Sequence, residues 1–258
     1  PVISVYQPAP IVILQVLIAA YGRDGIIRAA GLDLPATDGV GYIIGWQRAG
    51  CVMDIPPQLR RPDIDVIATD TIGLAANRNI LLDHASAPYL KFSDDDVTLT
   101  EQDLTDLIKA FDNYPDADIL LTRFGSPTRT PSAPANTFVI QDAPRGYWPS
   151  AIEINIRRSK VALRFDTRFG LNSSRYPYGE DDIYIVDAIR SGLTVRYVPV
   201  IVGRHEHLSS GERIHPLDRK FLATKTAVLR RLHPFSWPLR IMAHIIRSLK
   251  DQFTGRRP

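Results

Sequence analysis

Cysteine is almost absent from this sequence of 258 residues, and so are the signature motifs of several large enzyme classes. The single cysteine, Cys51, cannot form an intramolecular disulfide, and no CxxC pair or Cys/His cluster indicates structural zinc. We therefore expect a reducing compartment. No GxxxxGK[ST], GxGxxG, GxSxG or HExxH occurs, which argues against the usual nucleotide hydrolases, dinucleotide oxidoreductases, serine hydrolases and zincins.

Long hydrophobic runs are missing as well. Residues 1–22 carry no charge, but Pro8 and Pro10 interrupt them, and no basic segment precedes them. The unbroken apolar part is far shorter than the roughly 20 residues of a membrane span. We expect residues 11–19 to form a buried strand instead of a signal sequence or a membrane span.

The charge is distributed unevenly along the chain, although the formal net charge is only +3. Residues 204–258 carry 12 Lys and Arg against 4 Asp and Glu, whereas residues 1–203 carry 19 against 24. A basic tail of this kind is explained by solubility alone, by nucleic-acid binding or by an anionic membrane surface. The overall composition, with 45% hydrophobic residues, is that of a folded globular protein.

Short apolar runs alternate with helical patterns, as a parallel sheet with covering helices requires. Strands are expected at residues 11–19, 40–46, 65–68, 89–92, 119–124, 151–156 and 194–202, and helices at 24–30, 74–85, 101–113, 182–191, 217–232 and 239–253. The predicted fold is α/β and Rossmann-like, with a mainly parallel central sheet flanked by helices and followed by C-terminal helices. We assign residues 11–211 to a catalytic domain and residues 212–258 to a basic helical extension.

Three consecutive carboxylates, Asp94, Asp95 and Asp96, follow an apolar strand directly. At the carboxyl end of a parallel strand, where open α/β sheets place ligands, a divalent cation would relieve their mutual repulsion. A solvated acidic turn before the next helix explains the triplet about as well.

A second acidic cluster, Glu180, Asp181 and Asp182, opens a later helix, where the helix dipole by itself favours acidic residues. Taken together, the two clusters suggest a transferase site. One set of carboxylates would hold a metal, and the other would accept a proton from an attacking hydroxyl.

Two further segments are candidates for the same site. His205 and His207 lie two residues apart on an extended segment, so that either can complete a metal shell begun by Asp96. A surface histidine pair is the alternative, and for His207 it is the favoured one. Residues 71–79 combine a small-residue turn with a helix that carries Arg78, and they face either a phosphate or the acidic triplet, or only solvent.

The order of these segments resembles family 2 glycosyltransferases of the GT-A fold, and in particular their short bacterial members. The resemblance spans roughly residues 12–211. It rests on AAYG at 19–22, GWQ at 45–47, GLAANRN at 73–79, SDDDV at 93–97 and RFGLNSSRYPYGEDD at 168–182.

The resemblance implies an inverting, metal-dependent transfer of a sugar from a nucleotide sugar to an acceptor hydroxyl, as in polysaccharide biosynthesis. It assigns Mn²⁺ or Mg²⁺ to Asp94, Asp96 and His205, and the general base to the pair Glu180 and Asp181, with Asp181 preferred. The donor, most simply a UDP-sugar, is expected to contact Ala20, Tyr21, Gln47, Gly73, Asn77, Arg78, Asp94 and Asp95.

Two departures from the family pattern concern the nucleobase. Many relatives have an acidic residue where this chain has Gln47, which can donate or accept a hydrogen bond and so leaves the base open. The first motif is AAYG instead of the commoner TYN, which weakens the assignment of Tyr21 to base stacking.

Two other classes of function compete with this one. A sugar-phosphate nucleotidyltransferase shares the fold, but it usually needs a glycine-rich loop with Arg or Lys after the first strand. The segment from Gly22 to Gly25 is too poor in such residues to form that loop. A non-enzymatic binding module would use the basic tail and would leave both acidic clusters unexplained. We expect no nucleic-acid partner.

The tail itself contains an amphipathic, basic helix at residues 239–253. Packing of its apolar stripe on the catalytic domain is the commoner arrangement. The alternative is peripheral docking on the inner face of a membrane, where a glycan or lipid-linked acceptor would be presented to a cytoplasmic enzyme.

Overall fold

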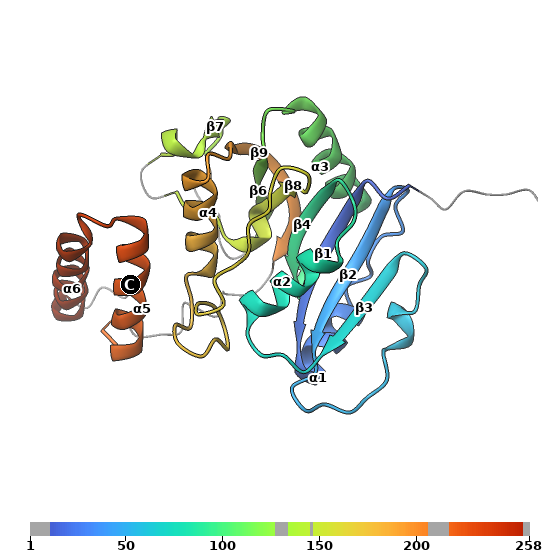
Figure 1. The fold of residues 1–258 in the computed structure, drawn as a ribbon, viewed down its shortest axis with the longest axis horizontal. Coiled ribbons are helices and arrows are strands. Elements are labelled where there is room, and N and C mark those ends of the chain that lie inside the picture. The colour runs from blue at the N-terminus through green and yellow to red at the C-terminus, as the bar shows by residue number, and fades with distance from the viewer. Residues whose placement is uncertain (1–10, 127–133, 145–146, 206–216, 255–258) are drawn as a thin grey trace, which may run out of the picture.

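The structure of the protein is a computed structural model, in which the described residues are 11–126, 134–144, 147–205 and 217–254. Within these residues, nine strands form one sheet in the order β3-β2-β1-β4-β8-β6-β9-β5, with β7 also paired to β9 (Figure 1). The strands are β1 (Leu14–Tyr21), β2 (Val40–Gln47), β3 (Ile64–Thr69), β4 (Tyr89–Asp94), β5 (Val97–Thr98), β6 (Ile119–Gly125), β7 (Phe138–Val139), β8 (Ile154–Arg157) and β9 (Val195–His205).

Six of the strands run in one direction, which confirms the predicted mainly parallel sheet. β1 pairs in parallel with β2 and β4, β2 with β3, and β6 with β9. β8 lies antiparallel between β4 and β6, so those two strands point the same way without touching through a ladder. The carboxyl ends of the six strands therefore meet at one edge of the sheet.

Helices cover both faces of the sheet, as the α/β pattern predicts. They are α1 (Gly22–Ala30), α2 (Leu74–His84), α3 (Glu101–Asn113), α4 (Glu180–Arg190), α5 (Arg219–Leu232) and α6 (Trp237–Thr254). α1 and α3 contribute to one apolar core and α2 and α4 to the other. Alternate residues of β1 enter the two cores, because successive side chains of a strand point to opposite faces.

One predicted strand is partly wrong. Residues 151–153 form a 3₁₀ turn, η3 (Ala151–Glu153), and only residues 154–157 are extended. The apolar pair Ala151 and Ile152 is buried, which gave this turn the appearance of a strand in the sequence. Two other 3₁₀ turns of the same length, η1 (Pro57–Leu59) and η2 (Ile140–Asp142), lie elsewhere in the chain.

The C-terminal helices extend the molecule to one side of the sheet (Figure 1). α5 packs on α4, where Val228 joins Phe169 and Ile183 in a small apolar cluster and Arg231 pairs with Asp187 at 2.8 Å. The boundary that we placed between residues 211 and 212 lies outside the described residues.

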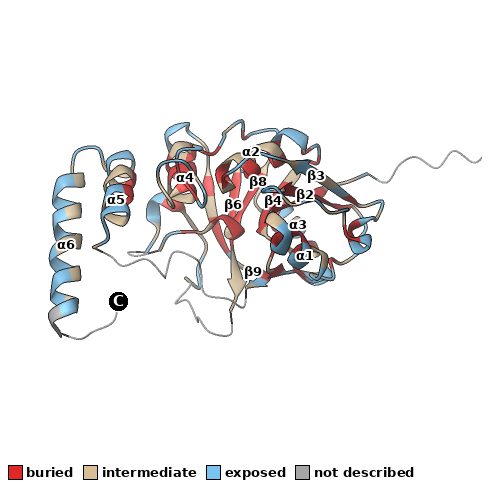
Figure 2. Ribbon diagram, turned by 90° about the horizontal axis from the view of Figure 1, so that it is seen from below, coloured by how far each residue is buried: buried red, intermediate tan, exposed pale blue. Residues whose placement is uncertain are grey.

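α6 packs on α5, and much of its surface remains exposed (Figure 2). Ile241 and Ile245 are half-buried, whereas a stripe of four apolar side chains faces outward: Leu239, Met242, Ile246 and Leu249, which are 71%, 57%, 61% and 41% exposed. None of the described helices has the length and apolar character needed to cross a membrane.

Candidate active site

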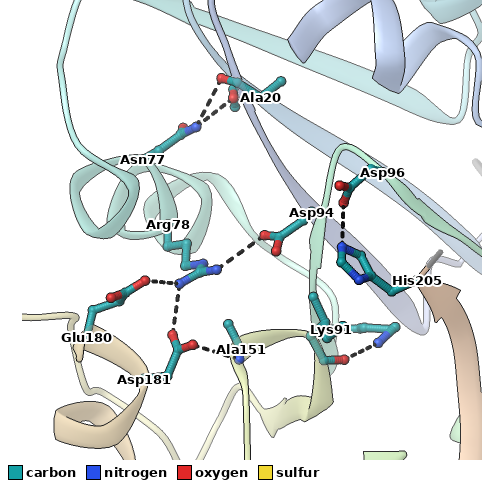
Figure 3. A network of polar contacts seen from close by, with 12 residues as sticks. Ala20, Asn77, Arg78, Lys91, Asp94, Asp96, Ala151, Glu180, Asp181 and His205 are labelled. Carbon is teal, nitrogen blue, oxygen red and sulfur yellow. Dashed lines mark hydrogen bonds and ion pairs between the residues drawn. The ribbon is translucent and has the colours of Figure 1, made fainter. Parts of the chain in front are cut away.

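The two acidic clusters, 86 residues apart between Asp94 and Glu180, meet at the carboxyl edge of the sheet. Asp94 ends β4, and Glu180 and Asp181 form the first turn of α4. The link between them is the guanidinium of Arg78, which α2 places between the strand and the helix (Figure 3).

Arg78 is 3% exposed and contacts three carboxylates at once. Its Nη1 donates to Glu180 Oε1 at 3.2 Å and to Asp181 Oδ1 at 2.9 Å, and its Nη2 donates to Asp94 Oδ1 at 3.2 Å. The guanidinium also lies 5.4 Å from the ring centroid of Phe165. One cation therefore serves three anions, which leaves the cluster with an excess of negative charge.

This shortage of positive charge, together with burial, changes the acidity of the cluster. Burial and the charge of Asp181 raise the pKa of Glu180 to about 7, against the opposing effect of Arg78. Burial likewise raises the pKa of Asp181, and Arg78 opposes it. Burial lowers the pKa of Arg78, but the carboxylates outweigh it and raise that pKa overall, so the guanidinium stays charged. A carboxylate with a raised pKa is a stronger base than a free one.

Asn77 holds α2 in the place that this arrangement requires. Its Nδ2 donates to Gly45 O at 2.7 Å and to Ala20 O at 3.5 Å. A Cβ atom on Gly45 would lie 2.1 Å from Asn77 Oδ1, so only glycine permits this close approach of helix and strand. The AAYG, GWQ and GLAANRN segments of the sequence are thus one packing unit.

Four of the eight residues expected to bind the donor are engaged in this packing. Gln47 is buried and its amide donates to Thr71 Oγ1 at 3.1 Å and to Gly73 O at 3.0 Å. Tyr21, by contrast, is 41% exposed at the end of β1. The structure thus brings Ala20, Gln47, Gly73 and Asn77 together as a scaffold and leaves Tyr21 accessible.

The three carboxylates of the triplet have different partners. Asp95 is buried and accepts two bonds from Arg28 of α1, from Nε at 3.1 Å and from Nη2 at 2.9 Å. Burial raises the pKa of Asp95 to about 7, although Arg28 opposes it. Asp95 therefore ties α1 to the acidic loop, while Asp94 points toward Arg78.

Asp96 lies near His205, the last residue of β9. The distance from Asp96 Oδ1 to His205 Nε2 is 3.3 Å, and β5 aligns Val97 with His205 across the sheet. In the described part of the chain, no three His, Cys, Asp or Glu side chains come together as a metal site. His207 lies outside the described residues.

The donor set of this pair is nevertheless suited to a divalent ion. A carboxylate oxygen and an imidazole nitrogen are accepted ligands of Mn²⁺, and Mg²⁺ takes one or two carboxylates with the remaining positions filled by phosphates and water. Asp94 has a second oxygen that Arg78 does not contact. These residues therefore fit an ion that a bound diphosphate helps to hold.

Residues that the sequence did not single out complete the site from the other side of Asp181. The main-chain N–H of Ala151 donates to Asp181 Oδ2 at 2.9 Å, so each oxygen of this carboxylate has one donor. Ala151 belongs to η3, and this turn is held in place by Lys91, whose Nζ donates to Ile152 O at 2.8 Å. The only sign of this in the sequence is a lysine inside the apolar run before the acidic triplet.

A sequence model of the family described as glycosyl transferase family 2 matches residues 55–174 of the chain. This segment includes Arg78, the acidic triplet and η3, and it ends before Glu180. The match agrees with the family 2 glycosyltransferase predicted from the sequence, over this segment of 120 of the 258 residues. No match was found among curated protein sequences.

Solved structures of S. aureus TarS share the fold of the chain. TarS 1–349 in complex with UDP-GlcNAc has a TM-score of 0.61 at 15% identity, over 85% of this chain and 66% of that one. TarS 1–349 in complex with UDP has a TM-score of 0.59 at 15% identity, over 94% and 72%. A longer TarS chain gives 0.58 at 15% identity over 84% of this chain, which spans 39% of its length. The predicted GT-A fold is confirmed.

Proposed function

We propose that this chain, whose residues 55–174 match the sequence model of glycosyl transferase family 2, transfers a sugar from a nucleotide sugar to an acceptor hydroxyl with inversion at the anomeric carbon. The observation that carries the proposal is the Arg78 cluster. It joins the carboxylate that ends β4 to the carboxylates that open α4 at one edge of the sheet.

Asp181 is the general base of this proposal, with Glu180 beside it. Each oxygen of Asp181 accepts one hydrogen bond and keeps a further lone pair, so the carboxylate is oriented and still able to take a proton. The acceptor hydroxyl loses its proton to Asp181 as its oxygen bonds to the anomeric carbon. The bond from that carbon to the diphosphate oxygen breaks on the opposite face, and the nucleoside diphosphate leaves with the electron pair.

Asp96 and His205 would hold Mn²⁺ or Mg²⁺, whereas Asp94, the third member of the predicted metal set, is turned toward Arg78 in this structure. When bound, the ion would neutralise the charge that develops on the leaving diphosphate. Arg78 is already committed to three carboxylates and has little capacity left for this task.

The donor we propose is a UDP-sugar. Two of the structures that share the fold are complexes of TarS with UDP-GlcNAc and with UDP. Tyr21 is the exposed aromatic ring nearest in sequence to the scaffold that Asn77 builds, and it is suited to stacking on a base. The Gln47 amide is occupied by Thr71 and Gly73, so in this arrangement it orders the scaffold.

The acceptor we propose is a glycan or lipid-linked hydroxyl presented at a membrane surface, with the enzyme on the cytoplasmic side. The exposed stripe on α6 supports this proposal. Arg240, Arg247 and Lys250 lie along the helix beside the four outward apolar side chains, an arrangement suited to lying in an anionic lipid interface.

A donor screen tests the proposed reaction. The purified chain is incubated with Mn²⁺ and a panel of nucleotide sugars, and release of nucleoside diphosphate is followed, with Asp181→Asn as the inactive control. We expect release from a UDP-sugar that depends on the ion and on Asp181. No release from any donor, or pyrophosphate formed from a nucleoside triphosphate and a sugar phosphate, would contradict it.

A further inference from the structure

Lys91 is a charged side chain in the middle of the sheet that the proposed reaction does not use. It is 0% exposed, and its neighbours in β4, Leu90 and Phe92, are core residues. Burying a lysine in such a place costs free energy unless its ammonium group gains a good partner. The partner is the carbonyl oxygen of Ile152, at 2.8 Å.

The turn that Lys91 holds is the same turn that holds Asp181. η3 has only three residues: Ala151 donates its N–H to Asp181 Oδ2 at 2.9 Å, and Ile152 accepts the lysine bond (Figure 3). A second restraint comes from Glu153, whose Oε2 accepts the N–H of Ser150 at 2.8 Å in a capping box. Residues on both sides of the turn are therefore fixed.

We propose that Lys91 is a positioning residue for the reaction, and that it acts through η3 to keep the Ala151 N–H aimed at Asp181. This inference rests on the proposed function, in which Asp181 is the base. Among the described residues, Lys91 makes no hydrogen bond to Asp181 or to the acidic triplet, and its effect is transmitted by one turn of main chain.

The electrostatic surroundings of Lys91 keep its ammonium group available as a donor. Burial lowers the pKa of Lys91 to about 8, and the charges of Glu153, Asp103 and Asp94 oppose that effect. The side chain is therefore protonated at neutral pH and below, where it can donate to Ile152.

The test compares Lys91→Met with a matched control, Gln15→Leu. Gln15 is also a buried polar side chain of the sheet, and its Oε1 accepts the N–H groups of Ser86 and Ala87 at 2.7 and 2.8 Å. It lies at the start of β1, at the opposite end of the strands from the acidic residues. Both variants replace a buried polar group by an apolar one of similar length.

For Lys91→Met we expect kcat to fall about tenfold, which is less than the roughly 10²-fold that a 1 Å misplacement can cost, with KM for the donor and binding of UDP unchanged. The acid limb of the kcat profile should move to higher pH, because Asp181 loses a donor that favours its charged form. Lys91→Arg should recover part of the loss. Gln15→Leu should lower the melting temperature and leave kcat and its pH profile unchanged.

Equal loss of kcat in both variants, or weaker UDP binding in Lys91→Met with normal kcat, would overturn the proposal. If Lys91→Met does not fold, Glu153→Leu replaces it, because this variant removes the acceptor that caps the same turn; wild-type kcat there would also overturn it. If the wild type transfers no sugar, the proposed function fails instead. Hydrogen exchange at the Ala151 amide then tests whether Lys91 holds the Ala151 N–H in place, without any measurement of activity. The exchange should be faster in Lys91→Met and unchanged in Gln15→Leu.

Discussion

At the scale of single residues, Asp181 is distinguished from its acidic neighbours by having one donor on each oxygen. Glu180 is the more buried of the pair, with its side chain 9% exposed against 23% for Asp181. An acceptor hydroxyl arriving from solvent therefore meets Asp181 more readily. This difference is the structural reason to prefer Asp181 as the base.

Replacing Asp181 by Asn should separate chemistry from binding. We expect Asp181→Asn to reduce turnover by about 10²–10⁴-fold, as is typical of a lost general base, while the affinity for UDP stays within about twofold. Initial rates and calorimetric titration with UDP measure the two effects. Asp187→Asn on the same helix, which breaks only the contact with Arg231, is the control and should keep its turnover. Near-normal turnover of Asp181→Asn would transfer the role to Glu180.

Asp95 and Asp96 are adjacent, but they contact different residues. We therefore expect their Asn variants to have opposite effects on ion-dependent binding and on stability. Asp96→Asn should abolish the Mn²⁺-dependent part of UDP binding with little change in stability, because Asp96 is a candidate ligand at the surface of the loop. Asp95→Asn should lower the melting temperature through loss of the Arg28 pair and keep ion-dependent binding. Titration of each variant with UDP, once with Mn²⁺ and once with EDTA present, measures the ion-dependent part of the binding. Ion-independent affinity in the wild type would refute the metal assignment.

Glu153 makes the stability of the fold depend on pH. Burial raises its pKa from the ordinary value of 4.5 to about 7, so the folded chain holds a proton that the unfolded chain releases. The free energy of unfolding should therefore fall as the pH rises from about 4.5 to about 7, by up to about 3 kcal/mol. Urea unfolding across this range should show a flatter profile for Glu153→Gln. If the free energy of unfolding changed with pH in the same way in the wild type and in Glu153→Gln, the raised pKa of Glu153 would not be its cause.

The residues of the site were only partly predictable from the sequence. Carboxylate triplets and a late histidine are visible as patterns, and the structure brings Asp94, Arg78, Glu180 and Asp181 into direct contact. The sequence pattern does not show which carboxylate each arginine pairs with. Arg28 and Asp95 are 67 positions apart, and only the packing of α1 on the sheet joins them. A main-chain donor such as Ala151 N–H leaves no trace in the sequence at all.

At the scale of elements, the start of α4 is fixed by a glycine. Gly179 precedes the helix with φ of 97°, and a Cβ atom there would lie 2.4 Å from Val228 Cγ2 of α5. The approach of α5 thus constrains the turn that carries Glu180 and Asp181. The helical extension is for this reason part of the construction of the site.

Gly179→Ala should therefore be more damaging than a matched glycine substitution at the other end of α4. Gly192 also has a positive φ, of 78°, but nothing lies within 4 Å of an added Cβ. We expect Gly192→Ala to cost about 1–2 kcal/mol from the backbone conformation alone. Gly179→Ala should cost about 1–3 kcal/mol more through the clash, and it should also reduce turnover. Equal free energies of unfolding in urea for the two variants would show that α5 moves away from the added methyl group at little cost.

Elements were predicted best where local signals determine them. The helix at 101–113 is found with the predicted bounds, because Thr100 and Asp103 form a capping box at its start. The turn at 151–153 was missed because its burial comes from tertiary contacts. The antiparallel direction of β8 could not be predicted either, since a four-residue strand carries no sign of its neighbours.

At the scale of the whole molecule, α6 is the outermost element and carries the clearest exposed apolar surface (Figure 2). If this surface docks on lipid, then α5, which packs on both α6 and α4, sets the orientation of the catalytic edge toward the membrane. The basic residues of α6 would each contribute about 1 kcal/mol near an anionic surface.

We expect the double variant Met242→Ser/Ile246→Ser to lose sedimentation with anionic liposomes while keeping transfer to a soluble acceptor. Both side chains are exposed, so their replacement should leave the melting temperature unchanged. Truncation after Pro234 should give the same loss of sedimentation. Neutral liposomes are the control for charge. Equal sedimentation of wild type and double variant would reject membrane docking, and loss of folding on truncation would show that α6 is needed by the domain.

The position of β8 in the sheet has a consequence for how the chain folds. The four strands β3, β2, β1 and β4 come from residues 14–94, whereas β8, which covers the free edge of β4, comes from residues 154–157. Until that later segment arrives, β4 is an open edge able to pair with other chains. Charged residues, lysine above all, discourage such edge-to-edge pairing. Lys91 is the residue of β4 that pairs with Asn155 of β8, and we expect it to discourage aggregation of the unfinished sheet until β8 arrives.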